Sequence, residues 1–316
     1  MTISRRLIAL LAIAMVSVNV PAYGWNGLGH MTVAYAAYQQ LTTRTKNRVS
    51  VLLRKHPDYG KWVTQVPAGT PAKFKRMMVF MIAATWPDQI KREAGYTEDG
   101  TAKGNRPDGP PSSQNTGYSD HLRHRYWHFV DTPFTQDGTA LPAIPVPNAE
   151  ERIGIFRGVL ASTEPDLLKS YDLTWLLHLV GDVHQPLHSA TRVSSSQPDG
   201  DAGGNLVNIC KPGCSSELHA FWDEILGTSS NPNSAVTVGK SLPAPDPTKA
   251  GKSDAADWAT ESFEAAKNEV YVAPIGAGAG PFTITAAYTD AARTLAKQRV
   301  ARAGARLANL LNTELK

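Results

Sequence analysis

Apolar residues recur at the spacing of an α-helix through most of this chain, and that periodicity limits the folds open to it. Seven segments place apolar side chains three or four positions apart instead of alternating strictly. They are residues 30–41, 46–55, 72–86, 151–162, 172–184, 254–270 and 284–315. Runs of β-branched residues are few, and GNLVNI at 204–209 is the best candidate for a short strand or hairpin. The pattern predicts a mainly α fold.

The first 24 residues have the three parts of a secretory signal peptide. Arg5 and Arg6 form a basic start, an uncharged apolar run follows over 7–20, and residues 22–24 (AYG) have the small-x-small pattern of a cleavage site. The apolar run is too short to span a bilayer. We expect cleavage before Trp25 and a secreted or periplasmic mature protein with no membrane anchor.

Residues 25–316 suit a single mainly helical domain. Two stretches rich in Gly, Pro, Asn and Ser, 97–119 and 228–253, have the composition of insertion loops. Neither separates halves of different composition. Loss of Arg5 and Arg6 with the signal peptide would lower the formal charge from +4 to +2. That charge is too small to indicate nucleic-acid binding by itself.

The chain has two cysteines, Cys210 and Cys214, in the sequence CKPGC. Pro-Gly between them favours a turn, and export favours oxidation to a disulfide. Two cysteines alone make a poor zinc site, because structural zinc takes four ligands. We predict a disulfide between them.

Histidine and aspartate are paired at helical spacing in two segments. HLVGDVHQPLH contains His178, Asp182 and His188, and HAFWD contains His219 and Asp223. Residues four apart share one helix face, so each pair can bind one metal ion. A lone pair of this kind is more often a solvated surface pair, but His178 interrupts an apolar stretch, where a buried histidine needs a partner. Two pairs and His188 within 46 residues favour a metal centre.

Two other stretches contain the same residue types. TWPD places Asp88 just after an apolar helical segment, and YWHFVDTP places His128 and Asp131 among aromatic residues. Taken alone, Asp88 is most simply a helix-terminus residue and His128 a core histidine held by a backbone carbonyl.

Six motifs occur together in a fixed order: WNGLGH, TWPD, WHFVD, HLVGDVHQPLH, GGN and HAFWD. In that order they resemble the zinc-dependent, single-strand-specific nucleases of the nuclease type I family, which includes the mung bean enzyme and bacterial members. The resemblance covers residues 25 to about 225, and the helical C-terminal part is consistent with it. It implies a single-domain helical fold, of the kind that phospholipase C shares, with a trinuclear zinc cleft.

The resemblance also implies which residues hold the three zinc ions. The first ion would have four side-chain ligands, Asp88, His128, His178 and Asp182. The second would have three, His188, His219 and Asp223. The third would be held by His30, by Asp182 as a bridge, and by the amino group and carbonyl oxygen of Trp25. The remaining histidines, His56, His121, His124 and His184, are then structural or surface residues, with a supporting role left open for His184.

The family's activity would be hydrolysis of single-stranded DNA and RNA to 5′-phosphorylated products, together with 3′-nucleotidase activity. A zinc-activated hydroxide is the nucleophile, with Asp182 and Asp88 as the catalytic carboxylates, and we expect a monomer. By resemblance, Phe129 stacks on a nucleobase and Asp131 hydrogen-bonds its edge, although Phe129 fits core packing equally well. The GGN stretch either brings its backbone and Asn205 close to the cleft or forms a turn.

Two other functions remain open. A zinc-dependent phospholipase C shares the fold and the three-zinc plan, but it usually has a glutamate at the position of Asp223 and has no need of WHFVD as a base pocket. A non-catalytic zinc-binding protein would fill every coordination position. The second site offers only three protein ligands, which leaves a place for water or substrate.

Overall fold

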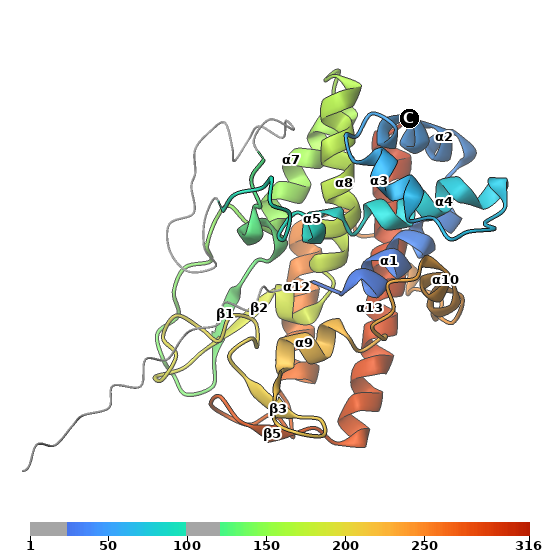
Figure 1. The fold of residues 1–316 in the computed structure, drawn as a ribbon. Helices are drawn as coiled ribbons and strands as arrows, with labels where there is room; N and C mark the ends of the chain where they lie inside the picture. The colour runs from blue at the N-terminus through green and yellow to red at the C-terminus, as the bar shows by residue number, and fades with distance from the viewer. Residues whose placement is uncertain (1–23, 99–120) are drawn as a thin grey trace, which may run out of the picture.

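The central element of the fold is α8 (Asp166–Asp182), which is buried continuously from Lys169 to Asp182. The computed structural model describes residues 24–98 and 121–316, so the predicted signal peptide up to residue 23 and most of the predicted loop 97–119 lie outside the described residues. Helices α2 (Thr43–Leu53), α7 (Ala149–Ala161) and α13 (Ala286–Glu314) pack against α8 (Figure 1). A helix that is apolar on all sides must be covered in this way.

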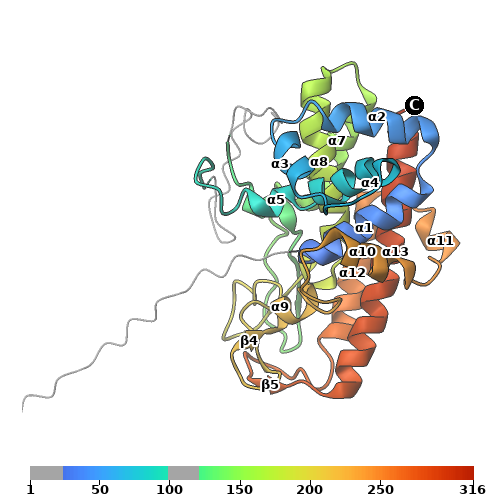
Figure 2. The same cartoon turned by 45° about the vertical axis from the view of Figure 1, so that its right-hand side comes forward.

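The first and last helices of the described chain lie side by side in both views (Figures 1 and 2). Helix α1 (Gly27–Gln40) packs against α13, and Gly304 of α13 faces Ala36 of α1 so closely that a Cβ atom at position 304 would overlap it. Helix α4 (Ala72–Ala83) covers another side of α1. The chain ends therefore build the layer beside α8.

Side-chain caps set where the long helices begin. Asn26 accepts hydrogen bonds from the backbone N–H groups of Leu28 and Gly29, and Thr42, Asn148 and Thr285 cap α2, α7 and α13 in the same way. Such caps satisfy backbone donors that have no partner within the helix. The seven predicted helical segments are confirmed, with α12 (Ala255–Ala265) continued by the π-helical turn η4 (Ala266–Val270).

Short helices complete the chain: α3 (Tyr59–Thr64), α5 (Trp86–Gln89), α9 (Leu218–Asp223) and the 3₁₀ helices η2 (Arg125–His128) and η3 (Pro186–His188). Strand β1 (Thr132–Thr135) runs parallel to β2 (Ala190–Val193). This pairing places the WHFVD segment beside HQPLH. The mainly α prediction is confirmed.

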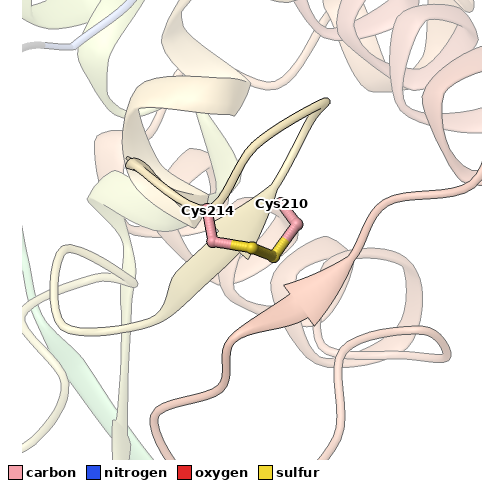
Figure 3. The surroundings of a disulfide bond; sticks show 2 residues. All are labelled: Cys210 and Cys214. Atoms are coloured by element: carbon pink, nitrogen blue, oxygen red, sulfur yellow. A yellow bond between two sulfur atoms is a disulfide. The ribbon is translucent and has the colours of Figure 1, made fainter.

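A second small sheet has β3 (Asn208–Cys210) between β4 (Ser216–Glu217), which is antiparallel to it, and β5 (Phe282–Thr283), which is parallel. The predicted strand at 204–209 is therefore correct only at its end. The predicted disulfide joins Cys210 and Cys214 and closes the turn after β3 (Figure 3).

The prediction of a loop over 228–253 is wrong for part of that segment. It contains α10 (Pro232–Lys240) and α11 (Pro247–Ala250), each with proline in its first turn and with Asn231 or Asp246 as its N-cap. Proline at the first helical position and Asn or Asp before it are helix-starting signals. The same residues also mark turns, which is why composition alone indicated a loop. Helix α10 packs against α1.

All seven tryptophans are at most 1% exposed and share the core with the apolar faces of the helices. They are Trp25, Trp62, Trp86, Trp127, Trp175, Trp222 and Trp258. Within the described ranges, every helix is either too short or too polar to cross a bilayer.

Burial lowers the pKa of His56 to about 3, with its ring packed against Trp62 and Trp86. Between pH 6.5 and 3 the unfolded chain therefore binds a proton that the folded chain excludes, and stability is lost as the pH falls through this window. The slope from this group is at most about 1.4 kcal/mol per pH unit. In metal-free protein, His56→Gln should flatten the acid side of the urea-unfolding profile. An unchanged profile would contradict this.

Candidate metal centre

Six separate elements bring histidine and aspartate side chains to the C-terminal end of α8. Helix α8 supplies His178 and Asp182, and α9 supplies His219 and Asp223. The start of α1, α5, η2 and η3 supply His30, Asp88, His128 and His188. The side chain of Asp88 is 13% exposed, and the other seven side chains are 6% exposed or less. The structure thus places together every side chain predicted to bind metal.

The first cluster consists of Asp88, His128, His178 and Asp182. The Oδ2 atom of Asp182 lies 3.0 Å from His128 Nδ1 and 3.2 Å from His178 Nε2. The Oδ1 atom of Asp88 lies 3.6 Å from His178 Nε2 and 3.9 Å from His128 Nδ1. Four potential donors therefore surround one point.

The second cluster consists of His188, His219 and Asp223. The two Nε2 atoms lie 3.1 Å apart, and Asp223 Oδ2 lies 3.5 Å from His219 Nε2. The other oxygen of Asp223 accepts a hydrogen bond of 2.8 Å from the side chain of Gln185. Helix α8 ends before Pro186, and the chain then turns to bring His188 to His219.

His30 joins the first cluster from the start of α1. Its Nε2 atom lies 3.4 Å from Asp182 Oδ1 and 3.9 Å from Asp88 Oδ2, and its ring stacks on His178. A Cβ atom at Gly24 would overlap Asp182 Oδ1 and lie 3.1 Å from His30 Nε2. The backbone before Trp25 therefore passes directly against the two side chains predicted to hold the third ion.

Backbone carbonyl oxygens orient three of the rings. Nδ1 of His178 bonds to the carbonyl of Ala84 at 2.8 Å, and that of His219 bonds to Gly203 at 2.7 Å. Nδ1 of His188 bonds to the carbonyl of His128 at 2.6 Å. A carbonyl only accepts hydrogen bonds, so the proton of each neutral ring is on Nδ1 and the Nε2 lone pair faces its cluster. This orientation is the usual one behind metal-binding histidines.

The donor set fits a cation. In the second cluster, the Nε2 lone pairs of the two neutral rings face one another at 3.1 Å, and they repel unless a cation, a proton or a metal ion, is shared between them. Asp182 Oδ1 and His30 Nε2 are buried and have no hydrogen-bond partner among the described residues. Buried polar atoms are normally satisfied. Nitrogen and carboxylate donors of this kind suit zinc.

The carboxylates of the two clusters differ in charge state when no cation is present. Burial opposes ionisation of Asp182, but His178 and His188 outweigh it and hold its pKa well below the usual range. Burial raises the pKa of Asp223 well above its usual value, and the nearby charges of Asp88 and Asp182 add to this. A cation in the second cluster would reverse that shift and keep Asp223 ionised.

Lys91 is a site residue that the sequence reasoning missed. Its side chain is 1% exposed, and its Nζ atom lies 2.7 Å from Asp88 Oδ1. The signal was the i, i+3 spacing from Asp88 in TWPDQIK: α5 ends at Gln89, and the turn that follows it brings the Lys91 side chain back to Asp88. A buried ammonium group is normally paired in this way.

The residues predicted to contact substrate lie near the centre but differ in exposure. Phe129 follows His128, is 7% exposed and belongs to the hydrophobic core. Asp131 is half-buried with a left-handed backbone (φ 57°). The Asn205 side chain donates a hydrogen bond of 2.7 Å to Ala202 within its own turn.

The backbone of Gly203 passes close to Leu187 and His219, which is one of the two alternatives that the sequence left open for the GGN stretch. Its φ is +61°, and a Cβ atom there would overlap the carbonyl oxygen of Leu187. Its own carbonyl orients His219. Of the leftover histidines, His56 and His124 are buried against tryptophans and His121 is exposed, as structural or surface residues would be.

The sequence of this chain is similar to those of known nucleases. The model of the protein family described as S1/P1 Nuclease matches residues 25–316. Nuclease S1 of Aspergillus oryzae is 25% identical over 206 residues, which cover 64% of this chain and 54% of the relative. Nuclease P1 of Penicillium citrinum is 23% identical over 200 residues, 63% of this chain and 57% of the relative. The aligned part thus spans a little over half the length of these curated relatives.

Proposed function

Because this chain belongs to the S1/P1 nuclease family, we propose that it is a zinc-dependent phosphodiesterase that hydrolyses single-stranded DNA and RNA to 5′-phosphorylated products. The observation that carries the proposal is the pair of imidazole lone pairs of His188 and His219, which face one another at 3.1 Å beside Asp223. Such an arrangement supports a bound cation. With only three protein donors, the second cluster keeps a coordination position for water or a phosphate oxygen.

The proposed ligand sets follow the clusters. Asp88, His128, His178 and Asp182 would hold the first ion, and His188, His219 and Asp223 the second. His30, Asp182 and the N-terminal Trp25 of the processed chain would hold the third. When bound, zinc supplies a lowered water pKa and positive charge for phosphate oxygens.

The side chains have distinct parts in this proposal. Asp182 would hold two ions, because its Oδ2 faces the first cluster and its Oδ1 faces His30. Lys91 holds the Asp88 carboxylate and adds positive charge. Three Zn²⁺ ions and three aspartates would leave a net charge of about +3 at the centre before Lys91 is counted. Phosphate attraction therefore needs no strongly basic surface.

Phe129 and Asp131 are the proposed contacts to an unpaired base, with Asn205 at the rim. Stacking and edge recognition both require a base that is free of its partner strand, which favours single strands. A 3′-mononucleotide carries the same cleavable bond, so 3′-nucleotidase activity is part of the proposal. We propose a secreted or periplasmic monomeric enzyme without a membrane anchor.

An assay of the processed protein tests the substrate class. We expect cleavage of single-stranded DNA, RNA and a 3′-mononucleotide, slow cleavage of a duplex of the same sequence, and products with 5′-phosphates. Hydrolysis of a phosphatidylcholine emulsion with no attack on nucleic acid would instead favour a phospholipase C. Tight zinc binding without any cleavage would favour a non-catalytic zinc-binding protein.

The chain terminus offers a separate prediction. While Gly24 precedes Trp25, the nitrogen of Trp25 is an amide with no lone pair for a metal, and Gly24 lies against Asp182 and His30. Cleavage before Trp25 would convert it to an amine that can bind metal through N and its own carbonyl. Protein that retains Gly24 should bind two zinc ions and lose most of its activity. Full activity with three ions would show that the terminus is incidental.

A further inference from the structure

His184 lies within the GDVHQPLH motif but belongs to neither cluster. Its ring is fully buried. Nδ1 bonds to the carbonyl of Val180 at 2.7 Å, and Nε2 lies 2.9 Å from Nη1 of Arg306 in α13. Because the carbonyl can only accept and the guanidinium can only donate, the neutral ring carries its proton on Nδ1. The side chain thus links the end of α8 to the last helix.

The same turn is also held through its backbone. Arg299 of α13 donates from Nε to the carbonyl of His184 at 3.1 Å. Ser262 of α12 donates to the carbonyl of Val183 and in turn accepts a hydrogen bond from Arg299. Arg299 is 2% exposed and Ser262 is fully buried. Two helices that supply no metal ligand therefore hold the turn just after Asp182.

One carboxylate pairs with the arginines of this part of α13. Glu261 of α12 accepts two hydrogen bonds of 2.9 Å from Arg306 and one of 3.0 Å from Arg302, and lies 3.6 Å from Arg299. Arg302 pairs with the same glutamate one helical turn from Arg306. No hydrogen bond from Arg302 to the turn is found among the described residues, which makes it a matched control.

The held turn connects the two metal clusters. The backbone N–H of Gln185 bonds to the carbonyl of Asp182 at 2.9 Å. The Gln185 side chain donates to Asp223 at 2.8 Å and accepts from the backbone of Leu187 at 2.6 Å. Three residues later comes His188. The position of the turn therefore sets where Gln185, Asp223 and His188 lie relative to Asp182.

We infer that Arg306, Arg299 and His184 form a buried clamp that positions the turn 183–185 and thereby sets the metal affinity of the second cluster. The clamp residues are positioning residues, since they touch no reacting atom. The inference rests on the proposed metal centre. It assigns to the C-terminal helix a part in metal binding, although that helix begins more than sixty residues after the last of the motifs, HAFWD.

Metal retention against a graded chelator, measured on the processed zinc-loaded protein, tests the clamp. Arg306→Met should lose one zinc ion per chain at a chelator concentration about 10–100-fold lower than wild type, the usual cost of changing groups behind metal ligands. Arg306→Lys keeps one hydrogen-bond donor, so it should lose zinc at a chelator concentration between those for Arg306→Met and wild type. Arg302→Met should retain all ions like wild type. Substituted Co²⁺ should show an altered absorption spectrum in Arg306→Met only.

His184→Gln gives a second approach, because its amide oxygen can still accept from Arg306 while the bond to Val180 is lost. This variant should fold and show a smaller loss of zinc affinity than Arg306→Met. If Arg306→Met does not fold, the zinc affinity of His184→Gln tests the clamp on its own. Equal metal retention by Arg302→Met and by the clamp variants that fold would overturn the inference. A wild-type protein that binds three ions yet cleaves no nucleic acid would instead overturn the proposed function.

Discussion

Asp182→Asn should lower kcat on single-stranded DNA by more than about 100-fold. Changes to groups behind a metal ligand already cost about 10–100-fold in affinity or activity, and Asp182 is itself a proposed ligand of two ions. Its oxygens lie 3.0 Å from His128, 3.2 Å from His178 and 3.4 Å from His30. The amide keeps the shape and removes the charge. Steady-state kinetics and metal content per chain measure the effect.

Asp166→Asn is the matched control for this prediction. Asp166 begins the same helix and pairs with Arg48 at 2.6 Å near the surface. The pair is bidentate and only partly exposed, but it lies at the start of α8, at the other end of the helix from His178 and Asp182, so activity and metal content should stay at the wild-type level. If Asp182→Asn retained wild-type kcat with three ions bound, the bridging role would be excluded.

Gly181→Ala should remove the third ion and reduce cleavage at least about 10-fold, the lower end of the cost of disturbing a metal ligand. A Cβ atom at this position would lie 2.8 Å from Nδ1 of His30. His30 cannot retreat easily, since it is fully buried and stacked on His178 at 3.7 Å. The ring must therefore shift, which displaces its Nε2 atom from the position that faces Asp182. Zinc content by atomic absorption, alongside cleavage rate, measures the outcome.

Gly158→Ala in α7 is the control for this substitution. An added Cβ at Gly158 meets nothing within 4 Å, and replacing a glycine inside a helix by alanine stabilises by about 0.5–1 kcal/mol. This variant should unfold at a slightly higher temperature and keep full activity. If Gly181→Ala behaved in the same way, the position of His30 would not matter for catalysis.

Two features of the sequence were the most informative: the helical periodicity predicted the long helices, and the i, i+4 pairs of histidine and aspartate predicted part of each metal cluster. His178–Asp182 and His219–Asp223 each lie on one helix and share one face, so local geometry was sufficient to predict them. Asp88 and His128 were different. Neither has a local partner that signals metal binding, and their placement in the first cluster depended on resemblance to a family.

The features that sequence reasoning missed depend on contacts between distant segments. Helix α10 begins with Asn and Pro, which also start turns, and its packing on α1 involves residues about 200 positions away. Lysine is usually an exposed residue, but Lys91 is buried against Asp88. The bond between Arg306 and His184 joins residues 122 positions apart. No periodicity within a segment reports such pairings.

Substrate contacts were the hardest part to predict, for a related reason. Phe129 satisfies an aromatic core position and a stacking position equally well, and the structure places it in the core at 7% exposure beside His128. An aromatic side chain at the edge of a core can serve both purposes only if one ring face meets ligand. Pattern alone does not distinguish these cases.

Zinc titration of the stripped, processed protein tests the central claim most directly. Metal is removed with a chelator, zinc is returned in measured equivalents, and cleavage of single-stranded DNA is followed at each step. We expect no cleavage without metal and full activity at three equivalents, in parallel with recovery in the 3′-mononucleotide assay. Undiminished cleavage by protein shown to contain no metal would contradict the account.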